Sequence, residues 1–364
     1  MSKPQKPIGL YIHVPFCKRK CRYCDFYSVT RTDLTEDYVK AAIRNIKTYG
    51  DIIFDTVYFG GGTPSLLSPN QIGEILRCAD LAADCEITLE CNPNSAAEEI
   101  FKSFAETGIN RISIGVQSLC DETLLTLGRL HNAETAVKTL MAAVKIFKNV
   151  SADLMIGLPG QTVYDIQTSI KTFAEIGLNH ISIYMLKIEA DTPFYKNPPE
   201  DLPDEDRVAE LYLETVKTAE ENGFCQYEIS NFAKPGYESK HNTKYWECNE
   251  YIGIGPSAHS YYGGKRFAVK RDLGDFLNAP VQNTYITDEN PGSADERIML
   301  NLRLTQTGIK TAPALTEKIL PFIKAGFLKT DNERLTLTPQ GCLVSNPIIG
   351  EIISIFEKSN FDNL

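Results

Sequence analysis

Three closely spaced cysteines are the residues of this sequence with the clearest capacity for chemistry. Cys17, Cys21 and Cys24 form the pattern C-x3-C-x2-C within the segment YIHVPFCKRKCRYCDF. Three thiolates this close along a chain can converge on one metal centre, and the spacing favours a 4Fe–4S cluster in which the protein holds three of the irons. The fourth iron would stay open to a small ligand. The alternative is zinc, which usually takes four ligands and would need His13 as the fourth.

The rest of the composition is that of a globular protein. The chain has 364 residues, of which 43% are hydrophobic, and its net charge is −10. An acidic chain is poorly suited to bind nucleic acid non-specifically, because that binding rests on neutralising phosphates. No apolar run reaches the ~18–20 residues of a membrane span, and we find no signal-peptide core. We therefore expect no nucleic-acid partner and a cytoplasmic location, with the other seven cysteines serving as packing residues.

Strand-like and helix-like segments alternate along the first half of the chain. Between the strand-like runs lie longer segments with helical spacing, for example Ile72, Ile75 and Ala79. The β-branched or aromatic runs are residues 9–16, 56–59, 86–90, 111–116, 152–156 and 180–186. Such alternation implies parallel βαβ units. We expect an α/β fold with a six-strand parallel sheet, either open or curled into part of a barrel. Polar residues or glycines follow each strand, at the edge where parallel α/β folds carry their chemistry.

The second half of the chain has a different character. Residues 190–206 are rich in proline and acidic residues, and residues 231–264 are rich in Gly, Asn, Tyr and His. Residues 315–327, 335–337 and 338–341 indicate a helix, a short hairpin and a helix, which is similar to a winged-helix module. We expect a core over 1–230, a connecting segment over 231–266 and a mostly helical, winged-helix-like C-terminal domain over 267–364. Because the chain is acidic, a lid or packing role for this domain is favoured over DNA binding.

The cysteine pattern, placed after the first strand of a six-unit α/β chain, resembles the signature of radical S-adenosylmethionine (SAM) enzymes. In that family the open iron chelates SAM, and reduction cleaves SAM to methionine and a 5′-deoxyadenosyl radical, which abstracts a substrate hydrogen. The resemblance implies a partial (β/α)6 barrel of the TIM type. It also implies a 4Fe–4S cluster held by Cys17, Cys21 and Cys24, with SAM as the second cofactor.

Further motifs extend the resemblance over nearly the whole chain. They are similar to those of the coproporphyrinogen dehydrogenase subgroup, which contains oxygen-independent coproporphyrinogen III dehydrogenases and haem chaperones. The motifs are YxHxPFC at 11–17, GGGTP at 60–64, ECNP at 90–93, RISIGVQS at 111–118, RxH at 129–131 and DLMIGLP at 153–159.

The resemblance also implies which residues contact SAM. Glycines lack a Cβ atom, so the backbone can approach a ligand closely, and Arg129 can pair with a carboxylate through its two-pronged guanidinium. Tyr11 and Tyr23 would flank the cluster. The other implied contacts are Gly61, Gly62, Thr63, Glu90, Gln117, Arg129 and Asp153. For the glycines the alternative is a tight turn, for the polar residues a satisfied position at the barrel rim, and for the tyrosines core packing.

Two features favour the haem chaperones over the dehydrogenases. The dehydrogenases carry a further cysteine two residues after the third, where this chain has Phe26, and a long extension before the cluster, whereas Cys17 comes early here. The segment HNTKYW at 241–246 matches a haem-associated HNxxYW motif of the chaperones. A neutral imidazole is a good haem ligand, so His241 would bind the iron while Tyr245 and Trp246 lie against the porphyrin. The alternative is that this segment packs the lower barrel; His259 is a further candidate ligand or a wall residue.

We therefore expect a radical SAM protein that binds haem or porphyrin as cargo and passes haem to other proteins. The family implies respiratory haemoproteins as recipients, and a cluster-linked homodimer is a further option. The alternative function is an enzyme that decarboxylates two propionates of coproporphyrinogen III to give protoporphyrinogen IX. A third class is a radical SAM enzyme with an unrelated substrate.

Overall fold

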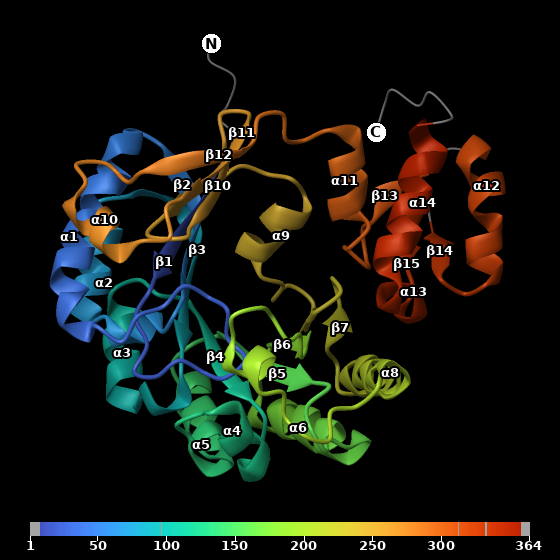
Figure 1. The fold of residues 1–364 in the computed structure, drawn as a ribbon, viewed down its shortest axis with the longest axis horizontal. Helices are drawn as coiled ribbons and strands as arrows, with labels where there is room; N and C mark the ends of the chain where they lie inside the picture. Colours follow the sequence, from blue (N-terminus) through green and yellow to red (C-terminus); the bar gives the residue numbers. More distant parts are fainter. Residues whose placement is uncertain (1–7, 96, 312, 332, 358–364) are drawn as a thin grey trace.

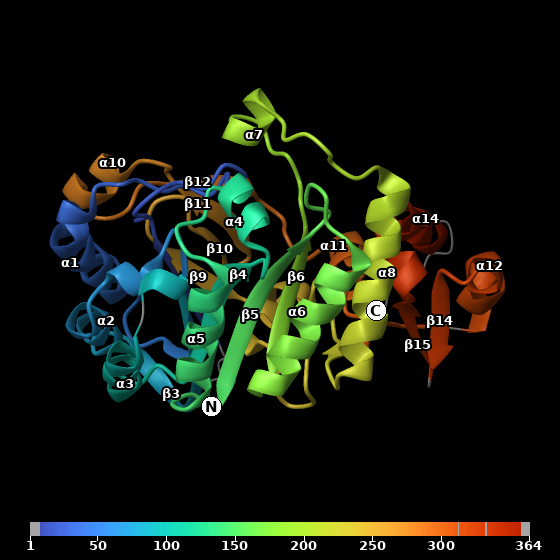
Figure 2. The same ribbon diagram turned by 90° about the horizontal axis from the view of Figure 1, so that it is seen from below.

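The computed structural model describes residues 8–95, 97–311, 313–331 and 333–357. Its first half consists of the predicted parallel βα units, seen in Figures 1 and 2. The six strands are β1 (Ile8–Val14), β2 (Ile53–Gly61), β3 (Asp80–Cys91), β4 (Arg111–Gln117), β5 (Asn149–Ile156) and β6 (His180–Met185). Each pairs in parallel with the next along the chain. The predicted fold class is confirmed, although β2 and β3 begin earlier than the sequence pattern indicated.

Helices cover the outer face of this sheet (Figures 1 and 2). Two of them begin with a capping box, in which Ser68 pairs with Gln71 and Thr162 with Asp165, so their first backbone N–H groups are satisfied. Their apolar faces join one core with the strand residues Leu10 and Ile12. The helices are α1 (Thr35–Ile46), α2 (Pro69–Leu76), α3 (Glu98–Glu106), α4 (Asp121–Leu127), α5 (Ala133–Val144), α6 (Val163–Ile176) and α8 (Glu205–Glu221). The short α7 (Pro193–Lys196) lies on the connection between β6 and α8, beyond the strand ends (Figure 2).

Short strands from the second half extend the sheet at both ends. Beside β1 lie β9 (Tyr251–Ile254), β10 (His259–Tyr262), β11 (Lys265–Val269) and β12 (Thr284–Asp288), and beside β6 lie β8 (Asn231–Ala233) and β7 (Cys225–Gln226). In the described part of the chain, β12 and β7 are the two edges of a twelve-stranded sheet, so the barrel is partial. Strand β11 includes residue 267, the position at which the sequence suggested that the C-terminal domain begins. The sheet therefore continues across the expected boundary.

The C-terminal elements lie beside α8 (Figure 1). They contain the predicted order of helix, hairpin and helix, with β13, β15 and β14 in a small separate sheet. The elements are α11 (Ala294–Asn301), β13 (Ile309–Lys310), α12 (Pro313–Lys324), β14 (Leu328–Asp331), β15 (Arg334–Leu337), α13 (Pro339–Leu343) and α14 (Ser345–Glu357). Among the residues described, no helix is long and apolar enough to cross a membrane.

Two further helices position the strands beside β1. Helix α9 (Lys240–Trp246) packs against β2, and α10 (Leu273–Asn278) packs against α1. The turn from β9 into β10 depends on Gly253, whose N–H donates to Ser260 Oγ over 2.9 Å. A Cβ added at Gly253 would lie well inside van der Waals contact with the carbonyl oxygen of His259 and 3.0 Å from Ala258 Cβ. The two strands can therefore approach this closely only because residue 253 has no side chain.

We predict that Gly253→Ala lowers the free energy of unfolding by about 1–3 kcal/mol, because the backbone of β10 must move away from β9. Gly274→Ala in α10 is the matched control, since its Cβ would meet only Asp272 Oδ1, at 3.4 Å. Urea unfolding of both variants measures the difference. Equal stability of Gly253→Ala and the wild type would show that the β9–β10 corner is not tightly packed.

Candidate functional site

The three cysteines lie on a loop, residues 15–31, that follows β1. The loop folds back on itself, since Cys17 N–H donates to Val29 O over 2.9 Å and Val29 N–H donates to Pro15 O over 2.7 Å. Its middle is fixed by Arg22 N–H, which donates to Leu127 O over 3.1 Å at the end of α4. The sequence therefore places three thiols on one anchored loop at the C-terminal edge of the sheet.

The three thiols are half-buried and close enough to influence one another. Burial raises the pKa of Cys24 to about 11, and the neighbouring Cys21 and Cys17 thiolates raise it as well. Burial also raises the pKa of Cys17, against a hydrogen bond from Thr63 that lowers it. Thiols in this setting need a bound cation to stay ionised, which is what a metal centre supplies. Among the described residues, no group of three or more His, Cys, Asp or Glu side chains is arranged to hold a metal ion.

The donor set fits a three-cysteine cluster better than four-ligand zinc. His13, the fourth ligand considered for zinc, is buried, and its ring is already engaged on both sides. Its Nε2 lies 2.9 Å from Tyr27 O, and its Nδ1 lies 3.2 Å from the Tyr11 hydroxyl. Hydrogen-bond donors also surround the thiols, as expected around cluster sulfurs. Thr63 Oγ1 lies 3.6 Å from Cys17 Sγ, and Arg129 Nη1 donates to Cys21 Sγ over 3.4 Å.

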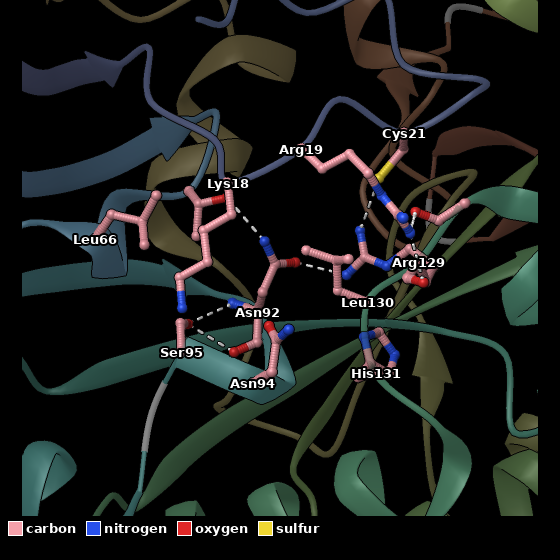
Figure 3. A pocket seen from close by; sticks show the side chains of 12 residues that line it. Lys18, Arg19, Cys21, Leu66, Asn92, Asn94, Ser95, Arg129, Leu130 and His131 are labelled. Atoms are coloured by element: carbon pink, nitrogen blue, oxygen red, sulfur yellow. Dashed lines mark hydrogen bonds between the residues drawn. The ribbon is translucent and has the colours of Figure 1, made fainter. Parts of the chain in front are cut away.

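A continuous set of hydrogen bonds joins the ends of β2, β3 and β4 to this loop (Figure 3). Asn92 Nδ2 donates to Thr63 Oγ1 over 2.8 Å, while Asn92 Oδ1 accepts from Arg129 Nη2 over 2.5 Å. The same Nη2 donates to the carbonyl of Gly115 over 2.6 Å. Asn92 was not among the predicted site residues, although it directly follows a strand within the ECNP motif. Its position at the edge of the sheet was the signal that could have identified it.

A small pocket opens beside this network (Figure 3), and its character is cationic. Lys18, Arg19 and Arg129 contribute to its walls together with Cys21, and Arg19 is fixed by donating to the carbonyls of Gly128 and Arg129 over 2.5 and 2.9 Å. The Nε atom of Arg129 is buried and has no hydrogen-bond partner among the described residues. A buried guanidinium with an unused donor suits an anionic group such as a carboxylate.

The inner face of the barrel carries two predicted site residues, Glu90 and Asp153. Glu90 accepts from the Tyr58 hydroxyl over 2.9 Å and from Gly61 N–H over 3.1 Å. Ser113 Oγ donates to Asp153 over 3.1 Å. Burial raises the pKa of Glu90 to about 7, helped by the negative charge of Asp153, and burial raises the pKa of Asp153 to about 6. This pair can accept hydrogen bonds from a ligand, and its protonation changes near neutral pH.

The other predicted site residues divide between the loop and the barrel wall. A Cβ added at Gly115 would lie 3.1 Å from Gln117 Nε2 and 3.3 Å from Arg129 Nη2, so the Gln117 amide lies close to the Arg129 guanidinium. Gly61 has φ +110° and faces the His13 ring, whereas Gly62 lets β2 approach the backbone of Phe16. Tyr23 packs on an apolar cluster beside the loop that includes Leu127, Met155, Leu158 and Phe194.

Comparisons with known proteins identify the family of this chain. Residues 11–173 match the model of the radical SAM superfamily. The heme chaperone HemW of Lactococcus lactis is 34% identical over 91% of this chain and 89% of its own length. HemW of Bacillus subtilis is 33% identical over 94% of this chain and 98% of its own length. The chain belongs to the HemW family of radical SAM proteins. Membership of the superfamily implies a 4Fe–4S cluster and SAM, and the predicted family is confirmed.

The fold comparison agrees with the partial barrel. The solved coproporphyrinogen III oxidase HemN of Escherichia coli, described as a radical SAM enzyme, superposes with a TM-score of 0.79 over 97% of this chain and 91% of that one. At 21% identity this likeness establishes the fold alone. It covers the C-terminal elements as well as the barrel.

The HNxxYW segment of this HemW-family chain forms α9 on the inner side of the barrel (Figure 1). His241 is buried, and both ring nitrogens are engaged: Nδ1 lies 2.8 Å from Thr56 Oγ1 and Nε2 lies 2.7 Å from the Tyr245 hydroxyl. Trp246 has the Arg303 guanidinium 5.7 Å over its ring. As positioned, His241 has a protein partner at each ring nitrogen. To bind haem iron it would have to give up the Tyr245 hydrogen bond.

The raised pKa of Glu90 predicts a specific pH dependence of stability. Between its usual value of 4.5 and about 7, the folded chain holds a proton that the unfolded chain has released, so the free energy of unfolding falls as pH rises through this window. From pH 5 to pH 8 the wild type should lose roughly 3 kcal/mol that Glu90→Gln retains. Urea unfolding without added SAM measures both slopes.

The exposed Glu99→Gln on α3 is the matched control and should keep the wild-type slope. Identical slopes in Glu90→Gln and the wild type would mean that Glu90 is ionised throughout and is not desolvated in the barrel.

Proposed function

We propose that this chain is a haem chaperone, which binds haem and transfers it to other haemoproteins. The observation that carries the proposal is similarity over more than nine-tenths of the chain to HemW relatives that are named heme chaperones. A second observation supports it. Phe26, whose side chain is exposed, stands two residues after Cys24, where the dehydrogenases of the subgroup carry a further cysteine.

We propose that Cys17, Cys21 and Cys24 hold the 4Fe–4S cluster and that Thr63 and Arg129 donate hydrogen bonds to its ligands. When bound, the cluster and SAM supply one-electron reduction and radical chemistry. The chain's own residues would orient SAM. Arg129 would pair with its carboxylate, Gln117 and Glu90 would bind polar groups, and Asp153 would accept from ribose hydroxyls. The remaining proposed contacts are Tyr11, Tyr23, Gly61 and Gly62.

The organisation and surroundings of the protein belong to the same proposal. We propose that respiratory haemoproteins receive the haem and that the chain acts in the cytoplasm, with cluster-linked dimerisation as an option for the loaded state. The division into a core over 1–230, a connecting segment over 231–266 and a C-terminal domain over 267–364 is likewise a proposal. The C-terminal elements pack on the core through Thr305, which donates from N–H and Oγ1 to the carbonyls of Tyr227 and Gln226 over 3.0 and 2.9 Å.

The alternative function is oxygen-independent decarboxylation of coproporphyrinogen III. The specific observation in its favour is the fold similarity to the E. coli enzyme over nearly the whole chain. Against it stands Phe26, because a cysteine at that position is part of the dehydrogenase pattern. Both the haem chaperone and the dehydrogenase would bind a tetrapyrrole, so binding alone does not distinguish the two functions. They differ in whether the bound tetrapyrrole is decarboxylated.

We predict that Cys17→Ala, Cys21→Ala and Cys24→Ala each abolish the cluster. Iron and sulfide content after anaerobic reconstitution should fall from about four of each per chain to near zero, because a cluster with two protein ligands is lost. Cys225→Ala, which removes an exposed thiol on β7, is the matched control and should keep the wild-type content. A full complement of iron in any of the three variants would remove that cysteine from the ligand set.

We predict that the chain binds haem saturably and releases it to an acceptor. A dissociation constant in the low micromolar range or tighter, about −8 kcal/mol, would suit a carrier. Mixing the haem-loaded chain with apomyoglobin should convert the absorption spectrum to that of the holo-acceptor, whereas the loaded chain alone should keep its spectrum. Bovine serum albumin loaded with haem is a control for passive release. Absence of saturable binding would overturn the proposed function.

A further inference from the structure

The five histidines of the chain all lie in its described part, and they fall into two groups. Four of them are buried with ring nitrogens in hydrogen bonds. His13, His180 and His241 use both nitrogens, and His131 Nε2 lies 3.1 Å from Val116 O. His259 differs, because its side chain is exposed and its ring makes no hydrogen bond among the described residues. An imidazole that is both accessible and unoccupied is the form that can bind a metal.

His259 lies at the start of β10 and faces a cavity of about 460 Å³. This volume is in the range of ligand pockets. The cavity is also lined by Phe26 and Tyr27 from the cysteine-bearing loop (residues 15–31) and by Tyr245 and Tyr251. Phe26 is 58% exposed, so its ring presents apolar surface that a ligand in the cavity could cover. The cavity therefore combines aromatic surface with an imidazole that forms no hydrogen bond to the described residues.

A cation completes the lining. Arg271 is exposed at the cavity, and its guanidinium lies 5.8 Å over the Tyr27 ring. Its Nη2 donates to the carbonyl of Asp25 over 2.5 Å, so the side chain is held in place on the cysteine loop. A fixed guanidinium at the rim of an aromatic cavity suits a carboxylate attached to an apolar ring system.

We propose that this cavity is the haem seat, in which His259 binds the iron, Phe26 and the tyrosines lie against the porphyrin, and Arg271 pairs with a propionate. The inference rests on the proposed function and names its cargo site. A metal binds the neutral form of an imidazole, whose ordinary pKa lies below neutral pH. In this proposal His241 keeps its hydrogen bonds to Thr56 and Tyr245. Because Asp25 and Phe26 belong to the cysteine loop, the cargo would lie directly beside the cluster site.

The test is a haem titration of the full chain and its variants, followed by absorption and resonance Raman spectroscopy. His259→Ala should weaken haem binding by roughly tenfold or more and remove the signature of imidazole ligation. Added imidazole should restore that signature in the variant, which a merely structural role would not allow. Arg271→Ala should weaken binding by roughly tenfold without changing the ligation signature, and Lys270→Ala is its matched control with unchanged binding.

Metal-free protoporphyrin separates the contributions of iron and porphyrin. His259→Ala should leave its affinity unchanged, because there is no iron to bind, whereas Arg271→Ala should still weaken it. His241→Gln should keep the wild-type haem spectrum. Loss of imidazole ligation in His241→Gln with retention in His259→Ala would overturn the inference, and so would an unchanged spectrum in both. A wild-type chain that does not bind haem at all would instead contradict the proposed function.

Discussion

The buried guanidinium of Arg129 joins the parts of this molecule that have to act together. It contacts Asn92 after β3, the Gly115 carbonyl in β4 and the Cys21 thiol on the loop after β1. A buried cation is costly unless anions or dipoles surround it, so these partners and the thiolates stabilise one another. In a parallel sheet the C-terminal ends of the strands lie at one edge. The hydrogen bonds of Arg129 join the residues at this edge to the loop that carries the cysteines.

The barrel interior imposes a second constraint. Side chains alternate along each strand, so β1 directs Leu10 and Ile12 into the helix-covered core while Tyr11 and His13 face inward. The inner side is consequently polar: Glu90 accepts from Tyr58, Asp153 accepts from Ser113, and His241 is hydrogen-bonded to Tyr245. Its carboxylates carry raised pKa values because they are desolvated, which is a cost that a ligand with donor groups would relieve.

Much of the fold could be predicted because strand and helix periodicity can be recognised in short stretches of the sequence. The β-branched runs of β1 to β6 and their glycine or polar ends follow from strand periodicity and the parallel arrangement. The strands β7 to β12 have two to five residues each, and their pairing is set by tertiary contacts that no local pattern records. The same limit explains His241. Its Thr56 partner is 185 residues away, so the sequence could not reveal that the imidazole is already occupied. The ECNP motif did not identify Asn92 as a site residue, because an asparagine after a strand is also common in turns.

We propose that the chain keeps a cluster and SAM site of the radical SAM type but carries its tetrapyrrole cargo unchanged. Anaerobic incubation with iron-sulfide-reconstituted protein, SAM, a strong reductant and coproporphyrinogen III, followed by mass spectrometry of the tetrapyrrole, tests it most directly. We expect the tetrapyrrole to keep its mass in a sample whose cluster content and SAM binding have been verified. Loss of two carboxyl groups as carbon dioxide would make the chain a dehydrogenase despite Phe26 and would rule out the proposed haem-chaperone function.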